Sequence, residues 1–150
     1  MAKGSPTMSA TVMELLDADR MLREMLRVTK PGGRVAVAVR AVDMSSFVNL
    51  PLRPELKRKV EALPNGTSGP QGCADASLYQ RFCAAGLGNM HMLPQLATYP
   101  GARAHAADER VEAALSPAEM AEWQTAVAQA ETAGTFFIAL PFHCAVGTKP

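Results

Sequence analysis

The pattern of apolar and polar positions begins, after a loose start, with a helical repeat over positions 17–30. Leu22 and Met25 recur at helical spacing, with further apolar neighbours beside them. Asp17 suits the N-cap, because its carboxylate can accept a hydrogen bond from a backbone N–H of the first turn. The segment therefore predicts a helix, and positions 1–10 before it are expected to be a flexible N-terminus.

A Pro-Gly-Gly turn at positions 31–33 ends this helix, because proline cannot continue it and glycine permits positive φ. Arg34–Arg40 follows at once with the sequence RVAVAVR. This short, almost continuously apolar run is typical of a strand buried on both faces of a parallel sheet. A helix, a turn and a buried strand make one half-unit of a layered α/β fold. Positions 11–13 are expected to end a short preceding strand.

The rest of the chain predicts further helices and strands around an irregular segment. Positions 42–73 are rich in proline and glycine and are interpreted as a long insertion after the strand. A capping-box pattern at Ser116, Pro117 and Glu119 starts one of the later helices. The other expected elements are helices at 56–63, 75–85, 106–115 and 116–132, an edge strand at 90–99 containing Pro94, and a last strand at 136–146 interrupted by Pro141.

Composition and charge argue against several classes of protein. With 150 residues, 48% hydrophobic and 19% charged, the chain reads as one ordinary globular domain. Fifteen basic and 14 acidic residues give a net charge of +1, which does not favour nucleic acid or anionic lipid as a partner. No apolar run reaches 18 residues, so no membrane span is expected. Three cysteines without CxxC spacing predict reduced thiols in a cytoplasmic protein.

Three segments together resemble one known family. Met21–Val37 reads MLREMLRVTKPGGRVAV and resembles the helix and fifth strand of class I S-adenosylmethionine-dependent methyltransferases, whose pattern is LREMxRVLKPGGRxxV. Gly134–Pro150 resembles the closing antiparallel strand of that family, and Cys73–Gly88 resembles the helix before its sixth strand. The resemblance spans Thr11–Pro150. It is greatest to small-molecule methyltransferases of the ubiquinone and menaquinone biosynthesis type.

The resemblance implies an α/β fold with a partial Rossmann-like sheet of strands five, seven and six, and flanking helices. The implied domain covers positions 11–150 and carries positions 42–73 as a lid-like insertion. In the family, strand five lies between strands four and seven, and strand six lies at the far edge.

The cofactor-binding half of the family is not matched by this chain. That half binds the cofactor through a Gly-rich turn after strand one, and the chain contains no GxGxG. We therefore expect a fragment, a split gene product or a natural truncation. Strand 34–40 would then keep an unpaired edge, which predicts either a homodimer through that edge or a complementing N-terminal half.

The activity implied at family level is methyl transfer from S-adenosylmethionine to a small molecule. This chain would contribute the substrate pocket and lid, and would be inactive alone, with doubtful cofactor binding of its own. The alternative is a non-catalytic oligomerising or small-ligand-binding module derived from a methyltransferase.

Candidate site residues follow from the resemblance and from the position of each strand end. Thr11, Met13 and Glu14 fall on the loop after strand four, near the cofactor and substrate of the family. Glu14 can instead be a solvated acid at a helix start. Arg40 and Asp43 lie at the carboxyl end of strand five, where open α/β sheets bind ligands, or they form an ion pair at the rim.

The proposed lid contributes Phe47 and Leu50, which line an apolar substrate pocket or belong to a satellite core. His143 on the last strand is a candidate general base, although many family members work by proximity alone. Its neighbour Cys144 faces the opposite side of the strand, so the two do not form a catalytic dyad. His91 and His105 have no partners at ligand spacing, so no metal site is expected.

Overall fold

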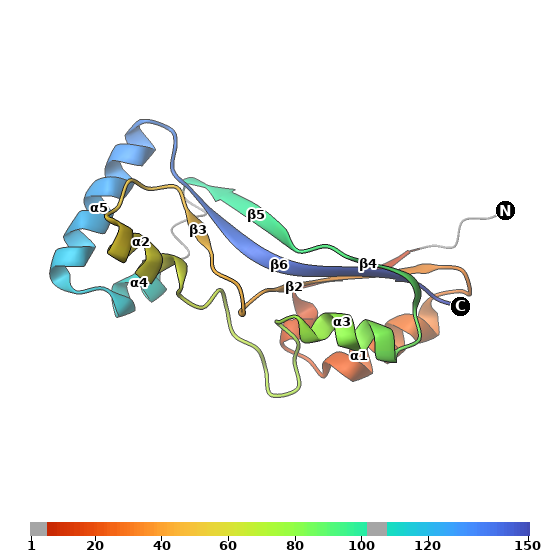
Figure 1. Cartoon of the computed structure of the whole chain (residues 1–150). Coiled ribbons are helices and arrows are strands. Elements are labelled where there is room, and N and C mark those ends of the chain that lie inside the picture. Colours follow the sequence, from red (N-terminus) through yellow and green to blue (C-terminus); the bar gives the residue numbers. More distant parts are fainter. Residues whose placement is uncertain (1–5, 102–107) are drawn as a thin grey trace. The chain divides into compact units, whose positions relative to one another are not determined.

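The computed structural model describes residues 6–101 and 108–150 (Figure 1). The chain forms two compact units, which are described one at a time. Unit 1 comprises Met1–Asp43, Gly66–Gln95 and Pro141–Pro150. Unit 2 comprises Met44–Asn65 and Leu96–Leu140. Among the described residues, no helix has the length and apolar character needed to cross a membrane.

Unit 1 is a sheet with two helices. Its elements are β1 (Thr7–Ala10), the 3-10 turn η1 (Val12–Glu14), α1 (Ala18–Val28), β2 (Arg34–Arg40), α3 (Ser77–Ala84), β4 (Gly88–Met92) and most of β6 (Phe137–Thr148). The boundaries of α1 follow from local chemistry, since the Asp17 side chain accepts the backbone N–H of Arg20 and caps the helix.

The strand order of unit 1 matches the order that the resemblance implies. β1 runs parallel to β2, with Thr7 opposite Val35. β2 runs antiparallel to β6, with Arg34 opposite Thr148, and β4 also pairs antiparallel with β6. The order β1-β2-β6-β4 corresponds to strands four, five, seven and six. The expected fold class, an α/β protein with strands five, seven and six and flanking helices, is therefore confirmed.

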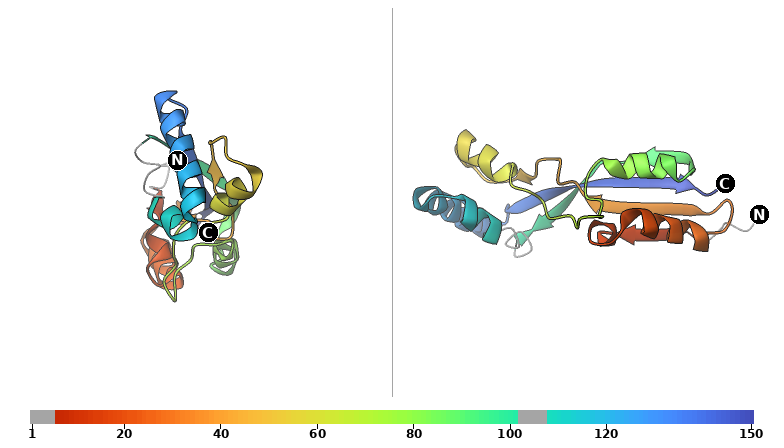
Figure 2. Two further views of the ribbon diagram at one scale, coloured as in Figure 1. Left: turned by 90° about the vertical axis from the view of Figure 1, so that its left-hand side faces the viewer. Right: turned by 90° about the horizontal axis from the view of Figure 1, so that it is seen from below.

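Both helices of unit 1 lie on one side of the sheet (Figures 1 and 2). Phe82 of α3 and Leu22 of α1 pack with the buried valines of β2 in one core. On the opposite face, Ala36 and Ala38 remain half-exposed. The expectation that β2 is buried on both faces is therefore wrong, because α1 and α3 cover the same side.

The N-terminal segment corrects two further expectations. Thr7–Ala10, expected to be flexible, forms β1, and Val12–Glu14 forms a 3-10 turn instead of a strand end. Residues Thr7–Ala10 of β1 pair with Val35–Ala38 of β2. The edge of strand 34–40 is thus occupied along these residues, and among the described strands β1 lies at the edge of the sheet.

Two prolines also behave differently from the expectation. Pro94 separates the single strand expected at 90–99 into β4 and β5 (Gln95–Pro100), both of which pair with β6. Pro141 does not interrupt β6, because it lies where β6 passes from pairing with β3 (Phe47–Val48) to pairing with β2. Its carbonyl accepts the backbone N–H of Ala41.

Unit 2 packs three helices around the first residues of β6. The helices are α2 (Pro54–Glu61), α4 (Asp108–Ala114) and α5 (Pro117–Thr132). Trp123 of α5, Leu56 of α2 and Ile138 of β6 share one buried core. Positions 42–73 therefore divide between the two units, with Met44–Asn65 in unit 2. Their role as a lid remains a prediction.

Candidate functional site

The parallel strands β1 and β2 end at the same edge of the sheet, which gathers several of the expected site residues in unit 1. Thr11 follows β1 with a left-handed φ of 61°, and its N–H donates to the Ala38 carbonyl at 2.8 Å. Glu14 ends η1, and Arg40 ends β2. Ligands of open α/β sheets bind outside such carboxyl ends, so this edge is the candidate site.

Glu14 is buried, with only 2% of its surface exposed, and it is fully engaged by the chain itself. Its Oε1 accepts the backbone N–H of Arg40 at 2.6 Å, and its Oε2 lies 3.8 Å from Nη1 of the same residue. The carbonyl of Glu14 accepts the N–H of Gly69, and a Cβ on Gly72 would meet that carbonyl at 2.0 Å. The interpretation of Glu14 as a solvated acid is therefore wrong, because the glycine-rich loop closes over it.

Asp43 and His143 come together although they lie a hundred positions apart in the sequence. Oδ1 of Asp43 lies 2.8 Å from Nε2 of His143, and Oδ2 accepts the N–H of Ala76 before α3. His143 is 5% exposed, whereas the Asp43 side chain reaches solvent. Although partial burial acts to raise it, the hydrogen bonds from His143 and Ala76 hold the pKa of Asp43 below its ordinary value.

Tyr79 of α3 completes this group on the other side of the imidazole. Its hydroxyl lies 2.9 Å from Nδ1 of His143, and the two rings meet edge to face with centroids 5.2 Å apart. Burial, with the neighbouring Cys144 and Asp43, raises the pKa of the Tyr79 phenol. Burial also raises the pKa of the Cys144 thiol. Asp43, His143 and Tyr79 are named the triad of unit 1 below.

The remaining expected residues do not belong to the triad. Arg40 pairs with Glu14 rather than with Asp43. Met13 is fully buried in the core of unit 1. Phe47 and Leu50 belong to unit 2, where Leu50 is part of the core and Phe47 packs its ring on Phe137.

The two histidines outside the triad are His91 and His105. His91 lies exposed on β4, and His105 lies outside the described residues. Within residues 6–101 and 108–150, no three His, Cys, Asp or Glu side chains are grouped so that they could hold a metal ion.

Tyr79 is the site residue that the sequence did not reveal. Tyr79 follows Leu78, which is buried in the core of unit 1, and is itself partly buried against that core. A half-buried tyrosine needs a partner for its hydroxyl, which was the available signal. The partner, His143, lies 64 positions away in the sequence, and only the packing of α3 near β6 identifies it.

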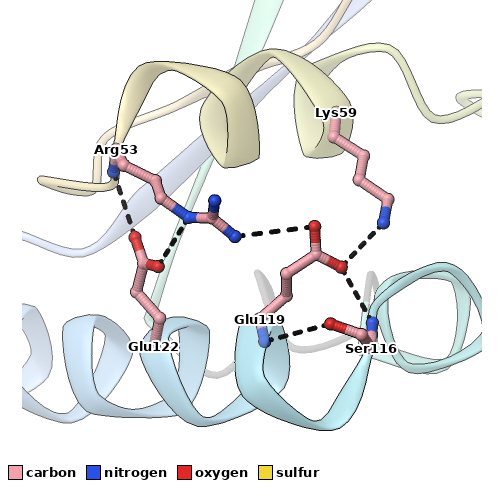
Figure 3. Close-up of polar contacts among 5 residues, drawn as sticks. All are labelled: Arg53, Lys59, Ser116, Glu119 and Glu122. Atoms are coloured by element: carbon pink, nitrogen blue, oxygen red, sulfur yellow. Dashed lines mark hydrogen bonds and ion pairs between the residues drawn. The ribbon is translucent and has the colours of Figure 1, made fainter.

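Unit 2 carries a different polar cluster, which joins α2 to α5 (Figure 3). Nε of Arg53 donates to Glu122 at 2.9 Å, and Nζ of Lys59 donates to Glu119 at 2.7 Å. Ser116 and Glu119 also form the expected capping box, which is confirmed. Lys59, followed by the backbone N–H of Ser116, lowers the pKa of Glu119 to about 2.

A shallow hollow of about 200 Å³ lies along α5 in unit 2. Met120, Trp123 and Val127 form its apolar floor, and Glu112 and Glu131 contribute carboxylates. Its lining favours an apolar group over an anion.

Comparisons with known proteins give structural likeness only. No protein-family model and no curated protein matches the chain. Among solved structures, phosphoethanolamine N-methyltransferase 2 of Haemonchus contortus, in complex with phosphomonomethylethanolamine and S-adenosylhomocysteine, is 15% identical, with a TM-score of 0.41 over 97% of this chain and 33% of that one. The same enzyme in complex with S-adenosyl-L-methionine is 14% identical, with a TM-score of 0.40 over 97% of this chain and 33% of that one. The [4+2]-cyclase SpnF gives 18% identity and a TM-score of 0.33, over 96% of this chain and 50% of that one. The chain thus spans about a third of the length of the first two proteins, and likeness at these scores assigns no family.

Proposed function

We propose that the chain is the substrate-binding part of an S-adenosylmethionine-dependent methyltransferase that acts on a small molecule. The observation that carries the proposal is the strand order β1-β2-β6-β4, with the triad and Arg40 at or after the carboxyl end of β2. The Pro-Gly-Gly segment and the last strand, on which the resemblance rests, occupy the corresponding places in this sheet. The ubiquinone or menaquinone type of substrate is part of the same proposal.

The chain's own residues do not fit the cofactor. The Gly-rich turn that approaches a bound nucleotide is missing from the sequence. Of the three candidates, Met13 is fully buried, Glu14 is engaged by Arg40, and the Thr11 hydroxyl donates to the carbonyl of Ala10. No step is therefore assigned to S-adenosylmethionine on this chain, which is proposed to be inactive alone.

A complementing N-terminal half is the partner that we propose. Within residues 6–101 and 108–150, β1 is an edge strand, and the face of the sheet opposite α1 and α3 is apolar and partly exposed. Paired positions on that face carry Met8, Ala36 and Val146 in one row and Ala10, Ala38 and Cys144 in the next. These rows form a partly exposed apolar surface, which a further layer of chain would bury.

The experiment is a calorimetric titration with S-adenosylhomocysteine after sizing chromatography. The chain alone is expected to give no binding. The same chain, co-expressed with an adjacent reading frame that encodes a Gly-rich strand-turn-helix segment, is expected to elute as a complex and bind. Micromolar binding by the isolated chain would contradict the proposed division of labour, and a co-purified complex that does not bind would contradict the proposed family function.

The second candidate function is a non-catalytic module that oligomerises or binds a small ligand. It is favoured by exposed apolar side chains around η1, with Leu15 70% exposed, and by the hollow along α5. This candidate would be favoured if the isolated chain formed a stable homodimer through the β1 edge. The homodimer would also have to show no binding of S-adenosylhomocysteine, with or without a partner.

A further inference from the structure

The hydrogen bonds of the triad have one direction. Because its pKa is held low, Asp43 is ionised at neutral pH, and an ionised carboxylate only accepts hydrogen bonds. Nε2 of His143, at 2.8 Å, therefore carries the proton. In the neutral imidazole Nδ1 is then the acceptor, so the Tyr79 hydroxyl donates to it at 2.9 Å.

This direction leaves the Tyr79 oxygen as the open end of the chain of hydrogen bonds. Its proton is directed at His143, and the backbone N–H of Cys144 also faces its oxygen, which leaves one lone pair for a donor from outside. The ring of Tyr79 is half-buried and the imidazole is almost fully buried, so a ligand reaches the tyrosine before it reaches the histidine. The order of groups resembles the serine, histidine and aspartate of hydrolases, with a phenol as the outer group.

We propose that the triad is a proton relay in which the Tyr79 oxygen takes the proton from a hydroxyl group of the bound small molecule. The O–H bond of the ligand breaks and a bond forms between its proton and the Tyr79 oxygen. The Tyr79 proton passes at the same time to Nδ1 of His143. The ligand is left as an oxyanion, and an imidazolium lies beside the Asp43 carboxylate, so the net charge is unchanged.

The relay also indicates which atom accepts the methyl group. A neutral amine attacks before it loses a proton, whereas a hydroxyl is a poor nucleophile until a base removes its proton. A base at this strand end therefore fits methylation of a hydroxyl oxygen. This substrate class rests on the proposed function, but the relay itself does not. His143 and Asp43 act through Tyr79 and are positioning residues.

The test measures the nucleophilic reactivity of Tyr79, which requires neither cofactor nor partner. The full chain is treated with N-acetylimidazole, and O-acetylation of its two tyrosines, Tyr79 and Tyr99, is followed by peptide mass spectrometry. The relay predicts that Tyr79 reacts faster than Tyr99 near neutral pH. Its rate should already be high well below pH 10, the range in which an unassisted phenol ionises.

Variants separate a relay from a hydrogen bond that only supports the fold. His143→Gln is expected to slow acetylation of Tyr79 at least about tenfold, because general-base assistance is worth roughly 10²–10⁴-fold. Asp43→Asn, which keeps the shape but removes the charge that fixes the imidazole, should slow it as well. His91→Gln, an exposed change on β4, is the matched control and should leave the rate unchanged.

Three results would overturn the relay. These are a Tyr79 rate that is unchanged in both triad variants, a rate that rises only near pH 10, and a Tyr79 that never reacts in a sample in which Tyr99 does. Thermal unfolding by circular dichroism checks that each variant is folded. If His143→Gln does not fold, Asp43→Asn and the pH profile of the unmodified chain still decide. A failed relay leaves the S-adenosylhomocysteine titration untouched, so the two proposals fail separately.

Discussion

Carboxylates perform opposite tasks in the two units. In unit 1, Glu14 is buried and accepts a backbone N–H, and Asp43 fixes a buried imidazole. In unit 2, Glu119 and Glu122 lie on the helix surface and bind the cations of α2 (Figure 3). Burial separates Glu14 from the surface carboxylates, because its side chain is 3% exposed against 18% for Glu119. The Asp43 side chain is 39% exposed and organises its site through its hydrogen bond to the buried His143.

The physical reason is the cost of desolvation. A buried carboxylate remains charged only when hydrogen bonds replace the water that it loses, so its neighbours must be placed closely. The loop Gly66–Gly72 can close over Glu14 because Gly72 has no side chain. A Cβ at that position would collide with the Glu14 carbonyl. An exposed ion pair keeps most of its water and contributes little, but it tolerates loose geometry.

The largest expected effect comes from the apolar cores, and it tests whether the units are independent. Phe82→Ala in unit 1 should lower the free energy of unfolding by about 3–5 kcal/mol, because Phe82 is 1% exposed. Leu56→Ala is the matched change in unit 2, with an expected loss of about 2–5 kcal/mol. Hydrogen exchange should show lost protection in α3 and β2 for the first variant, and in α2 and α5 for the second. Loss across both units in both variants would mean that they unfold as one cooperative body.

A smaller effect is expected when the buried carboxylate is removed. Glu14→Ala leaves the backbone N–H of Arg40 without its acceptor in a part-buried place, which should cost about 1–3 kcal/mol. Glu14→Gln keeps an acceptor oxygen and serves as the control. Urea unfolding followed by circular dichroism measures both. Equal losses in the two variants would show that the negative charge matters more than the hydrogen bond.

The smallest effect concerns the surface cluster of unit 2 and depends on pH. The pKa of Glu119 falls from its ordinary 4.5 to about 2 on folding, so its contribution is present above about pH 4.5 and is lost as the pH falls toward 2. Glu119→Gln should therefore flatten the decline in stability of unit 2 between these values. Fluorescence of the single tryptophan, Trp123, reports on this unit.

Glu55→Gln is the control for the acid experiment, because Glu55 is exposed and forms an ion pair with its helix neighbour Arg58. Added salt should weaken the contribution of Glu119 further, since exposed charges are screened. An acid transition of Trp123 that is identical in all three proteins would mean that the α2–α5 ion pairs contribute nothing.

Local signals in the sequence predicted the elements of the fold well. Asp17, the Pro-Gly-Gly turn and Ser116 set helix and strand boundaries through hydrogen bonds that span a few residues, and each has the expected role. The resemblance supplied the strand order. The first strand was expected to end at positions 11–13, whereas β1 ends at Ala10. Its residues, TMSA, show neither a strong apolar run nor a turn signal, and its partner lies beyond α1 in the sequence.

The candidate site was predicted only in part. His143 and Asp43 were each singled out, but for separate roles, and Arg40 was expected beside Asp43 rather than beside Glu14. Tyr79 carried no recognisable motif. Strand ends could be located from the sequence, but the direction in which each side chain extends depends on which neighbouring element packs against it.

The sequence by itself therefore determined the local elements of this protein, the sheet order that its motifs imply and the absence of a Gly-rich turn from its 150 residues. Only the tertiary structure decided which polar groups meet. Contacts such as that between Asp43 and His143 join residues brought together by strand pairing. Their meaning depends on burial, which sets the cost of a charge and is a property of the packed chain, not of any one segment.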